Sequence, residues 1–186
     1  MPIRAIDPDG KRIFFVGGAN NDQDGWNYIQ RWRSAFTNAG VKGFRRVNAS
    51  TGKIGDIAFT AGHRNYSSSY RAPGAMKDYG ANHSSIDQAV NQVKRSLSAS
   101  PLQEDEQLNL AGYSFGSVLQ AQVALKLADE GTYIDNLILI GAPISDDSSL
   151  FKQLSENENI GNVIRVDIEG DLLSNPQDVF DFLKGA

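Results

Sequence analysis

Short, largely apolar segments alternate along this chain with longer segments in which apolar residues recur every three to four positions. Residues 12–16 and 137–140 belong to the first kind, and residues 26–39 and 84–98 to the second. A strand that is apolar throughout is covered on both faces of its sheet, and a helix with one apolar side can provide that cover. The alternation predicts an α/β fold, a three-layer sandwich with a mostly parallel central sheet.

No repeat or low-complexity linker divides the chain, so we expect residues 1–186 to form a single domain. Residues 61–82 are rich in Gly, Ser, Tyr and Asn without a period, which is typical of a functional or mobile loop. The predicted order of elements is strand 12–16, helix 26–39, strand 43–47, strand 54–60, helix 84–98, strand 106–111, helix 115–130, strand 137–140, helix 150–158, strand 162–166 and a helix that begins at residue 178.

Composition excludes several classes of function. The chain has no cysteine, which rules out disulfides, thiolate nucleophiles and cysteine-based zinc or iron–sulfur sites, and we expect neither a metal nor a cofactor. The net charge of −4 argues against a nucleic-acid partner, and the densest basic group, Arg31, Arg33, Arg45 and Arg46, is interpreted as a solvated face. No apolar run reaches membrane-spanning length and no signal peptide is visible, so we expect no integral membrane segment and a location in the cytoplasm, or export without a cleaved signal.

The strongest chemical motif is Gly-x-Ser-x-Gly, formed by Gly112, Ser114 and Gly116 between a predicted strand and a predicted helix. A sharp strand-to-helix turn projects the serine hydroxyl above the sheet, and glycine two residues on either side permits the close packing that this turn requires. The motif therefore predicts Ser114 as a nucleophile. The alternative is a turn of a nucleotide-binding fold with Ser114 as a helix N-cap, but the glycine order of a dinucleotide-binding loop and the Gly-Lys-Ser/Thr of a P-loop are both absent.

A nucleophilic serine also needs an oxyanion hole, made by the amide after the nucleophile and by a second amide from an earlier strand-end loop. Phe115 supplies the first of these amides. The second is expected from Gly18 or Ala19, which follow the first apolar strand. The alternative for that segment is an ordinary turn after a strand.

The catalytic acid is expected at the end of a later strand. Asp171 follows a glycine in the loop after strand 162–166, at the sheet edge where function concentrates in open α/β sheets. Asp167 is the second candidate, and the alternative for both is a carboxylate that caps the loop, through Ser174 or backbone amides.

The base is the least determined member of the predicted triad. The order Ser, Asp, His predicts a histidine after Asp171, yet the two histidines of the chain, His63 and His83, both precede Ser114. Three explanations are open: the histidine lies beyond Ala186, an upstream histidine has been recruited, or the protein does not catalyse. Among the upstream pair we favour His63, because it follows a candidate strand and only spatial reach to the serine matters.

With the Gly-x-Ser-x-Gly motif at Ser114, Gly18 upstream and Asp171 downstream, the chain resembles α/β-hydrolase-fold lipases and esterases, and in its short length cutinase-type minimal hydrolases. The resemblance implies acyl transfer on a small-molecule or lipid ester. Cutinase-type hydrolases lack a large lid, and the alternative is that residues 61–82 form one. Trp26, Tyr66, Tyr70 and Tyr113 are candidates to line an acyl cleft or to belong to the core. Competing hypotheses are an inactive binding protein on a hydrolase scaffold and a flavodoxin-like nucleotide or flavin binder.

Overall fold

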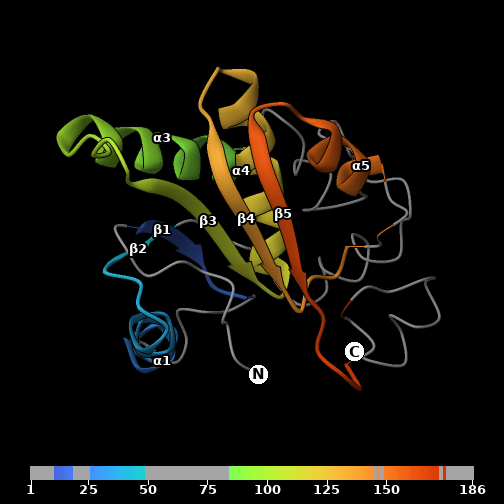
Figure 1. Cartoon of the computed structure of the whole chain (residues 1–186). Helices are drawn as coiled ribbons and strands as arrows, with labels where there is room; N and C mark the ends of the chain where they lie inside the picture. Colours follow the sequence, from blue (N-terminus) through green and yellow to red (C-terminus); the bar gives the residue numbers. More distant parts are fainter. Residues whose placement is uncertain are drawn as a thin grey trace.

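Five parallel strands form a sheet in the order β2-β1-β3-β4-β5 (Figure 1). The computed structural model describes residues 11–18, 26–48, 84–144, 146, 149–171 and 174. The predicted strand 54–60, the loop 61–82 and the helix from residue 178 lie outside these residues. The strands are β1 (Lys11–Val16), β2 (Gly43–Arg46), β3 (Gln107–Tyr113), β4 (Ile134–Ile140) and β5 (Ile160–Val166).

Helices cover both faces of the sheet, which confirms the predicted α/β class with a parallel sheet. Helix α1 (Trp26–Asn38) packs on one face. The other face carries α3 (Ser84–Ala99), α4 (Phe115–Asp129) and α5 (Ser149–Glu156). The chain leaves β1 toward one edge of the sheet and leaves β3 toward the other. Right-handed crossovers in opposite directions place α1 and α4 on opposite faces.

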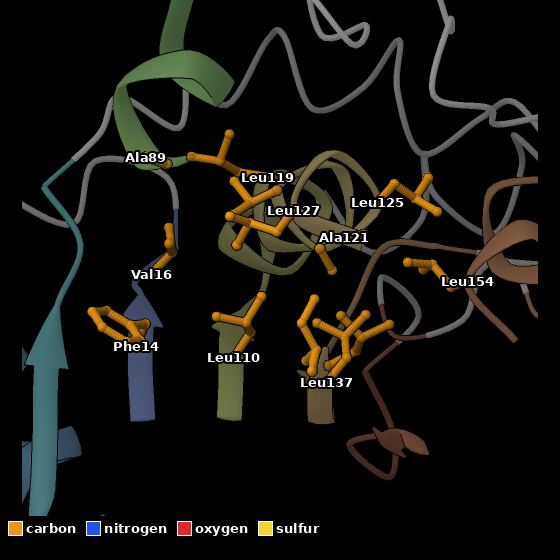
Figure 2. Packing of buried hydrophobic residues seen from close by; sticks show 14 of the residues in the cluster. Phe14, Val16, Ala89, Leu110, Leu119, Ala121, Leu125, Leu127, Leu137 and Leu154 are labelled. Carbon is orange, nitrogen blue, oxygen red and sulfur yellow. The ribbon is translucent and has the colours of Figure 1, made fainter. Parts of the chain in front are cut away.

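Helix α4 is the centre of the larger core. Nearly all its side chains are buried, because it lies between the sheet and the neighbouring helices α3 and α5. Figure 2 shows Leu119 and Leu127 of this helix close to Val16 and Leu110, which project from β1 and β3. The strand that ends in the Gly-x-Ser-x-Gly turn and the helix that begins there are therefore both held by buried apolar contacts.

Strands β4 and β5 begin earlier than their apolar patterns predict, at Ile134 and Ile160. The added positions of β4 include the polar residues Asp135 and Asn136, and a ladder of side-chain hydrogen bonds crosses four strands here. Asn162 donates to Asn136 over 3.1 Å, Asn136 donates to Asn109 over 2.6 Å, and Asn109 donates to a β1 carbonyl oxygen over 3.2 Å. Side-chain hydrogen bonds thus replace the hydrophobic contacts by which the sequence pattern identifies a strand.

At the opposite end from the Gly-x-Ser-x-Gly turn, β1 is joined to β3 by an ion pair. Arg12 donates to both carboxylate oxygens of Glu106, over 3.0 Å from Nε and 2.9 Å from Nη2. It also donates to the backbone oxygen of Ser100. Both charged side chains are largely buried, so removal of either would leave the other charge without its partner in a place of low polarity.

We expect Glu106→Ala to lower the free energy of unfolding by about 3–5 kcal/mol, the usual cost of breaking a buried pair. Urea denaturation of the purified protein measures this change. Glu104→Ala is the matched control, because Glu104 lies exposed in the same turn. An equal effect of the two substitutions would contradict a stabilising role for the Arg12 pair.

Candidate active site

Ser114 has a backbone conformation that L-amino acids rarely adopt. Its φ is 52° and its ψ is −128°, and it is the one non-glycine residue with positive φ in the part of the chain that the structure describes. Such a conformation costs on the order of 1–3 kcal/mol and persists only where the surroundings impose it. Ser114 lies between the last residue of β3 and the first residue of α4, so the strain is located at the predicted strand-to-helix turn.

The two glycines of the motif are required by backbone packing. A Cβ on Gly112 would stand 2.6 Å from the backbone oxygen of Gly116, and a Cβ on Gly116 would stand 2.6 Å from the backbone oxygen of Val16 and closer still to that of Gly17. Backbone atoms cannot yield as the end of a side chain can. Only glycine at both positions lets the turn pack against its own helix and against the end of β1.

Ser114 does not act as a side-chain cap. Its side chain makes no capping hydrogen bond to α4, which argues against the N-cap alternative. The turn is held through backbone instead, since the Ser114 N–H donates to the Ile140 oxygen at the end of β4 over 2.8 Å. The buried Ser117 hydroxyl donates to the same oxygen over 3.3 Å. These bonds fix the turn and leave the Ser114 hydroxyl outside the capping network.

The loop after β1 approaches Ser114 closely. A Cβ on Gly18 would stand 3.2 Å from the Ser114 Cβ, so this predicted oxyanion-hole residue lies beside the predicted nucleophile. Phe115, the other predicted donor, is the first residue of α4, where the helix dipole places partial positive charge. Ala19 lies outside the described residues. The chain reverses its winding direction between β1 and β3, and this switch point is where open α/β sheets bind ligands.

Tyr28 is a site residue that the sequence analysis missed. The Gly18 N–H donates to the Tyr28 hydroxyl oxygen over 3.3 Å, so this amide is directed at a side chain of α1. Burial raises the pKa of the Tyr28 phenol, against the opposing effects of hydrogen bonds from Gly18 and Trp32. The hydroxyl therefore keeps its proton at neutral pH and well above. The helical spacing of Tyr28, Trp32 and Phe36 is the sequence signal that could have identified Tyr28. The same spacing is equally expected of a helix face that packs in the core.

Half-buried aromatic rings surround the turn on the α1 face. Trp32 lies 4.9 Å from Tyr113 between ring centroids, and Tyr28 lies 6.4 Å from Tyr113. Of the four predicted cleft aromatics, Tyr113 is therefore placed beside Ser114, within a continuous aromatic cluster. The side chains of Trp26, Tyr66 and Tyr70 lie outside the described part of the structure.

An apolar wall borders the turn on the side of β4 and β5. Gly141 follows β4 with a φ of 52°, and a Cβ there would stand 2.8 Å from Ile168 Cδ1 and 3.6 Å from Tyr113 Cε2. Ile168 follows β5 and is 36% exposed, one of two large apolar side chains exposed among the described residues. The absence of a side chain at Gly141 brings Ile168 toward Tyr113, next to Ser114.

The two candidate acids have different surroundings. Asp167 accepts hydrogen bonds from Arg165 over 2.9 Å and from the Ser174 hydroxyl over 3.3 Å, as the loop-capping alternative predicts. Asp171 lies beyond a turn in which Gly170 has a φ of 80° and the Asp171 N–H donates to the Ile168 oxygen over 3.0 Å. Asp167 is thus bonded within its own loop, and Asp171 follows that turn after β5.

Few of the remaining predictions concern residues that the structure describes. His63 and His83 lie outside the described residues. Within the described ranges, no cluster of His, Asp and Glu side chains is arranged to hold a metal ion, and no helix has the length and apolarity to cross a membrane.

No protein-family model matches this chain, and no curated protein matches it in sequence. Function must therefore be argued from the site itself.

The strain at Ser114 predicts an ordering of two variants that both lack the hydroxyl. Ser114→Gly removes the Cβ that makes positive φ costly, whereas Ser114→Ala keeps it. We expect the glycine variant to be the more stable by about 1 kcal/mol, after the larger unfolded-state entropy of glycine is deducted. Thermal and urea unfolding of the two proteins side by side give the difference. An alanine variant as stable as the glycine variant would show that the backbone is unstrained.

Proposed function

We propose that this protein is a serine hydrolase that cleaves a carboxylic ester through an acyl-enzyme on Ser114. The observation that carries the proposal is the strained turn at Ser114, enforced by glycines whose side-chain space is filled with backbone. Strain of this kind collects at functional sites, because folding alone gives no reason to maintain it. A serine whose only task was to begin a helix would adopt ordinary capping geometry.

The proposed reaction begins with attack by the Ser114 Oγ on the ester carbonyl carbon. The new O–C bond forms as the carbonyl electron pair moves to oxygen, and the hydroxyl proton passes to a base. Collapse of the intermediate breaks the bond to the leaving alcohol, which takes that proton. Water then releases the acyl group by the same steps. The Phe115 amide at the start of α4 faces the developing oxyanion in this scheme.

Asp171 and His63 complete the proposed triad. Ser114 follows β3 and Asp171 follows β5, so their strands are two positions apart in the sheet. Two strand spacings amount to about 10 Å, a gap that an imidazole ring can bridge from above the edge. A carboxylate there orients the ring and stabilises its charged form. His63 is the proposed base, and His83 is the other histidine of this chain.

The architecture supports a hydrolase-like assignment. In the strand order β2-β1-β3-β4-β5, Ser114 follows the central strand, Gly18 follows its neighbour β1, and Asp171 follows β5, two strands away on the other side. Tyr113 and Ile168 offer an apolar surface beside Ser114, which favours an ester with an apolar acyl group. Flavodoxin-like folds share this strand order, and a flavin absorption band in the purified protein would instead support that class.

We expect a fluorophosphonate probe to label Ser114 covalently, and p-nitrophenyl butyrate to be hydrolysed. Ser114→Ala should abolish both, because the nucleophile is lost. Intact-mass spectrometry and peptide mapping measure the labelling. Ser155→Ala is the control, since Ser155 is an exposed serine on α5 that bonds only its own helix.

Substitution of each histidine by glutamine extends that experiment. Loss of the base should slow labelling by a large factor, so His63→Gln is expected to label slowly and His83→Gln normally. The reverse result would move the base to His83. Absence of both labelling and hydrolysis in the folded wild-type protein would contradict the proposed enzyme activity. It would favour the hypothesis of an inactive binding protein.

The acid is tested by a pair of isosteric variants. We expect Asp171→Asn to lower kcat by on the order of 10³–10⁴-fold, because an amide supports the wrong imidazole tautomer. Asp167→Asn should leave kcat within a few fold, since that carboxylate is bound to Arg165 and Ser174. Steady-state kinetics on p-nitrophenyl butyrate decide the matter. A larger loss in the Asp167 variant would reassign the acid.

A further inference from the structure

We infer that the Tyr28 hydroxyl is a donor to the oxyanion that forms on the substrate carbonyl, in addition to the Phe115 amide. The inference rests on the proposed esterase function and adds a catalytic side chain from α1, an element that the Gly-x-Ser-x-Gly motif does not include. The first observation is the direction in which the Gly18 amide points. The Gly18 N–H is aimed at the Tyr28 oxygen over 3.3 Å.

Gly18 links the Tyr28 hydroxyl to the surroundings of Ser114. A Cβ on Gly18 would stand 3.2 Å from the Ser114 Cβ, and the Gly18 amide is in turn bonded to Tyr28. The positive end of this amide therefore reaches the site through the phenol. A chain of N–H to O–H to oxyanion polarises each member and strengthens the last bond.

The hydrogen bond that the Tyr28 hydroxyl already makes shows which further hydrogen bond it can form. A tyrosine oxygen accepts at its lone pairs and donates one proton. Here it accepts from the Gly18 amide over 3.3 Å. No described residue accepts the phenol proton. The Gly18 amide is a donor, so the phenol proton is left for an acceptor that enters the site.

The surroundings of Tyr28 hold the hydroxyl in place. Tyr28 lies on α1 with its ring centroid 6.4 Å from that of Tyr113, which precedes Ser114 and also contacts Trp32 of the same helix. The ring is half-buried, and burial raises the pKa of the phenol. A neutral, immobilised donor is what electrostatic preorganisation requires, because it needs no reorientation when charge develops.

The chemistry involves no transfer of the phenol proton. As Ser114 Oγ bonds to the carbonyl carbon, the carbonyl electron pair moves to oxygen and the Tyr28 hydrogen bond to that oxygen strengthens. When the leaving alcohol departs, the electron pair re-forms the carbonyl and the bond weakens again. Tyr28 thus stabilises the intermediate more than the bound ester, which lowers the barrier with little effect on ground-state binding.

We expect Tyr28→Phe to lower kcat on p-nitrophenyl butyrate by about 100–1000-fold with KM within about threefold, the effect of one lost oxyanion donor. Binding of a trifluoromethyl ketone, which forms a stable oxyanion, should weaken by a similar factor. Tyr133→Phe is the matched control, because it removes the hydroxyl of an exposed tyrosine outside the site. Thermal unfolding of each variant reports whether the fold is retained.

A second variant separates donation from loop positioning and preserves the shape of the ring. A fluorinated tyrosine at position 28, introduced by stop-codon suppression, ionises within the assay range. Its phenolate still accepts from the Gly18 amide but has no proton to donate. We expect kcat to fall as pH rises through the pKa of that phenol, whereas the wild-type protein shows no such loss.

The outcomes distinguish this inference from the proposed function. Active wild-type protein with Tyr28→Phe within threefold of it, or a fluorotyrosine protein with the wild-type pH profile, overturns the oxyanion role and leaves the esterase standing. Absence of Ser114 labelling in wild-type protein overturns the esterase itself. A kcat loss in Tyr28→Phe without the added pH dependence assigns Tyr28 to holding the Gly18 loop and also overturns the inference.

Discussion

Contact between backbone and backbone at the end of β1 is the constraint on which the site depends. The turn that carries Ser114 packs so tightly against the oxygens of Val16 and Gly17 that Gly116 has no space for a side chain. Gly112 also has no space for a side chain, because a Cβ there would clash with the backbone of Gly116 and Ser117 at the start of α4. These contacts hold Ser114 at positive φ, and they set the Gly18 loop beside it.

Strands β1 and β3 carry polar interactions at the ends opposite the Ser114 turn. Arg12 and Glu106 join β1 to β3, and the asparagine ladder from Asn109 ties β3 to β4 and β5. The strands are thereby held in register by satisfied polar groups at one edge and by apolar packing under α4 in the middle. A strained turn at the carboxyl edge is tolerable because the rest of the sheet supplies the free energy to maintain it.

Much of this arrangement follows from local patterns. The alternation of elements predicted the class of fold, and the spacing of Gly112, Ser114 and Gly116 predicted a turn whose strain the structure describes. The early start of β4 was missed because Asp135 and Asn136 look like loop residues until their hydrogen-bond partners on β3 are known. Partners from a distant strand leave no trace in a period-two pattern.

Sequence by itself thus determined which residues can form the turn, since only glycine tolerates such close backbone approach, and it narrowed the candidates for the proposed acid to Asp167 and Asp171. Tertiary structure decided how these residues are surrounded. It engaged Asp167 with Arg165 and Ser174, brought Ile168 next to Tyr113, and directed the Gly18 amide at Tyr28 on a separate helix. The physical reason is range: steric limits on φ and ψ act within a few residues, whereas hydrogen bonds and ring contacts between elements exist only after the sheet and its helices have packed.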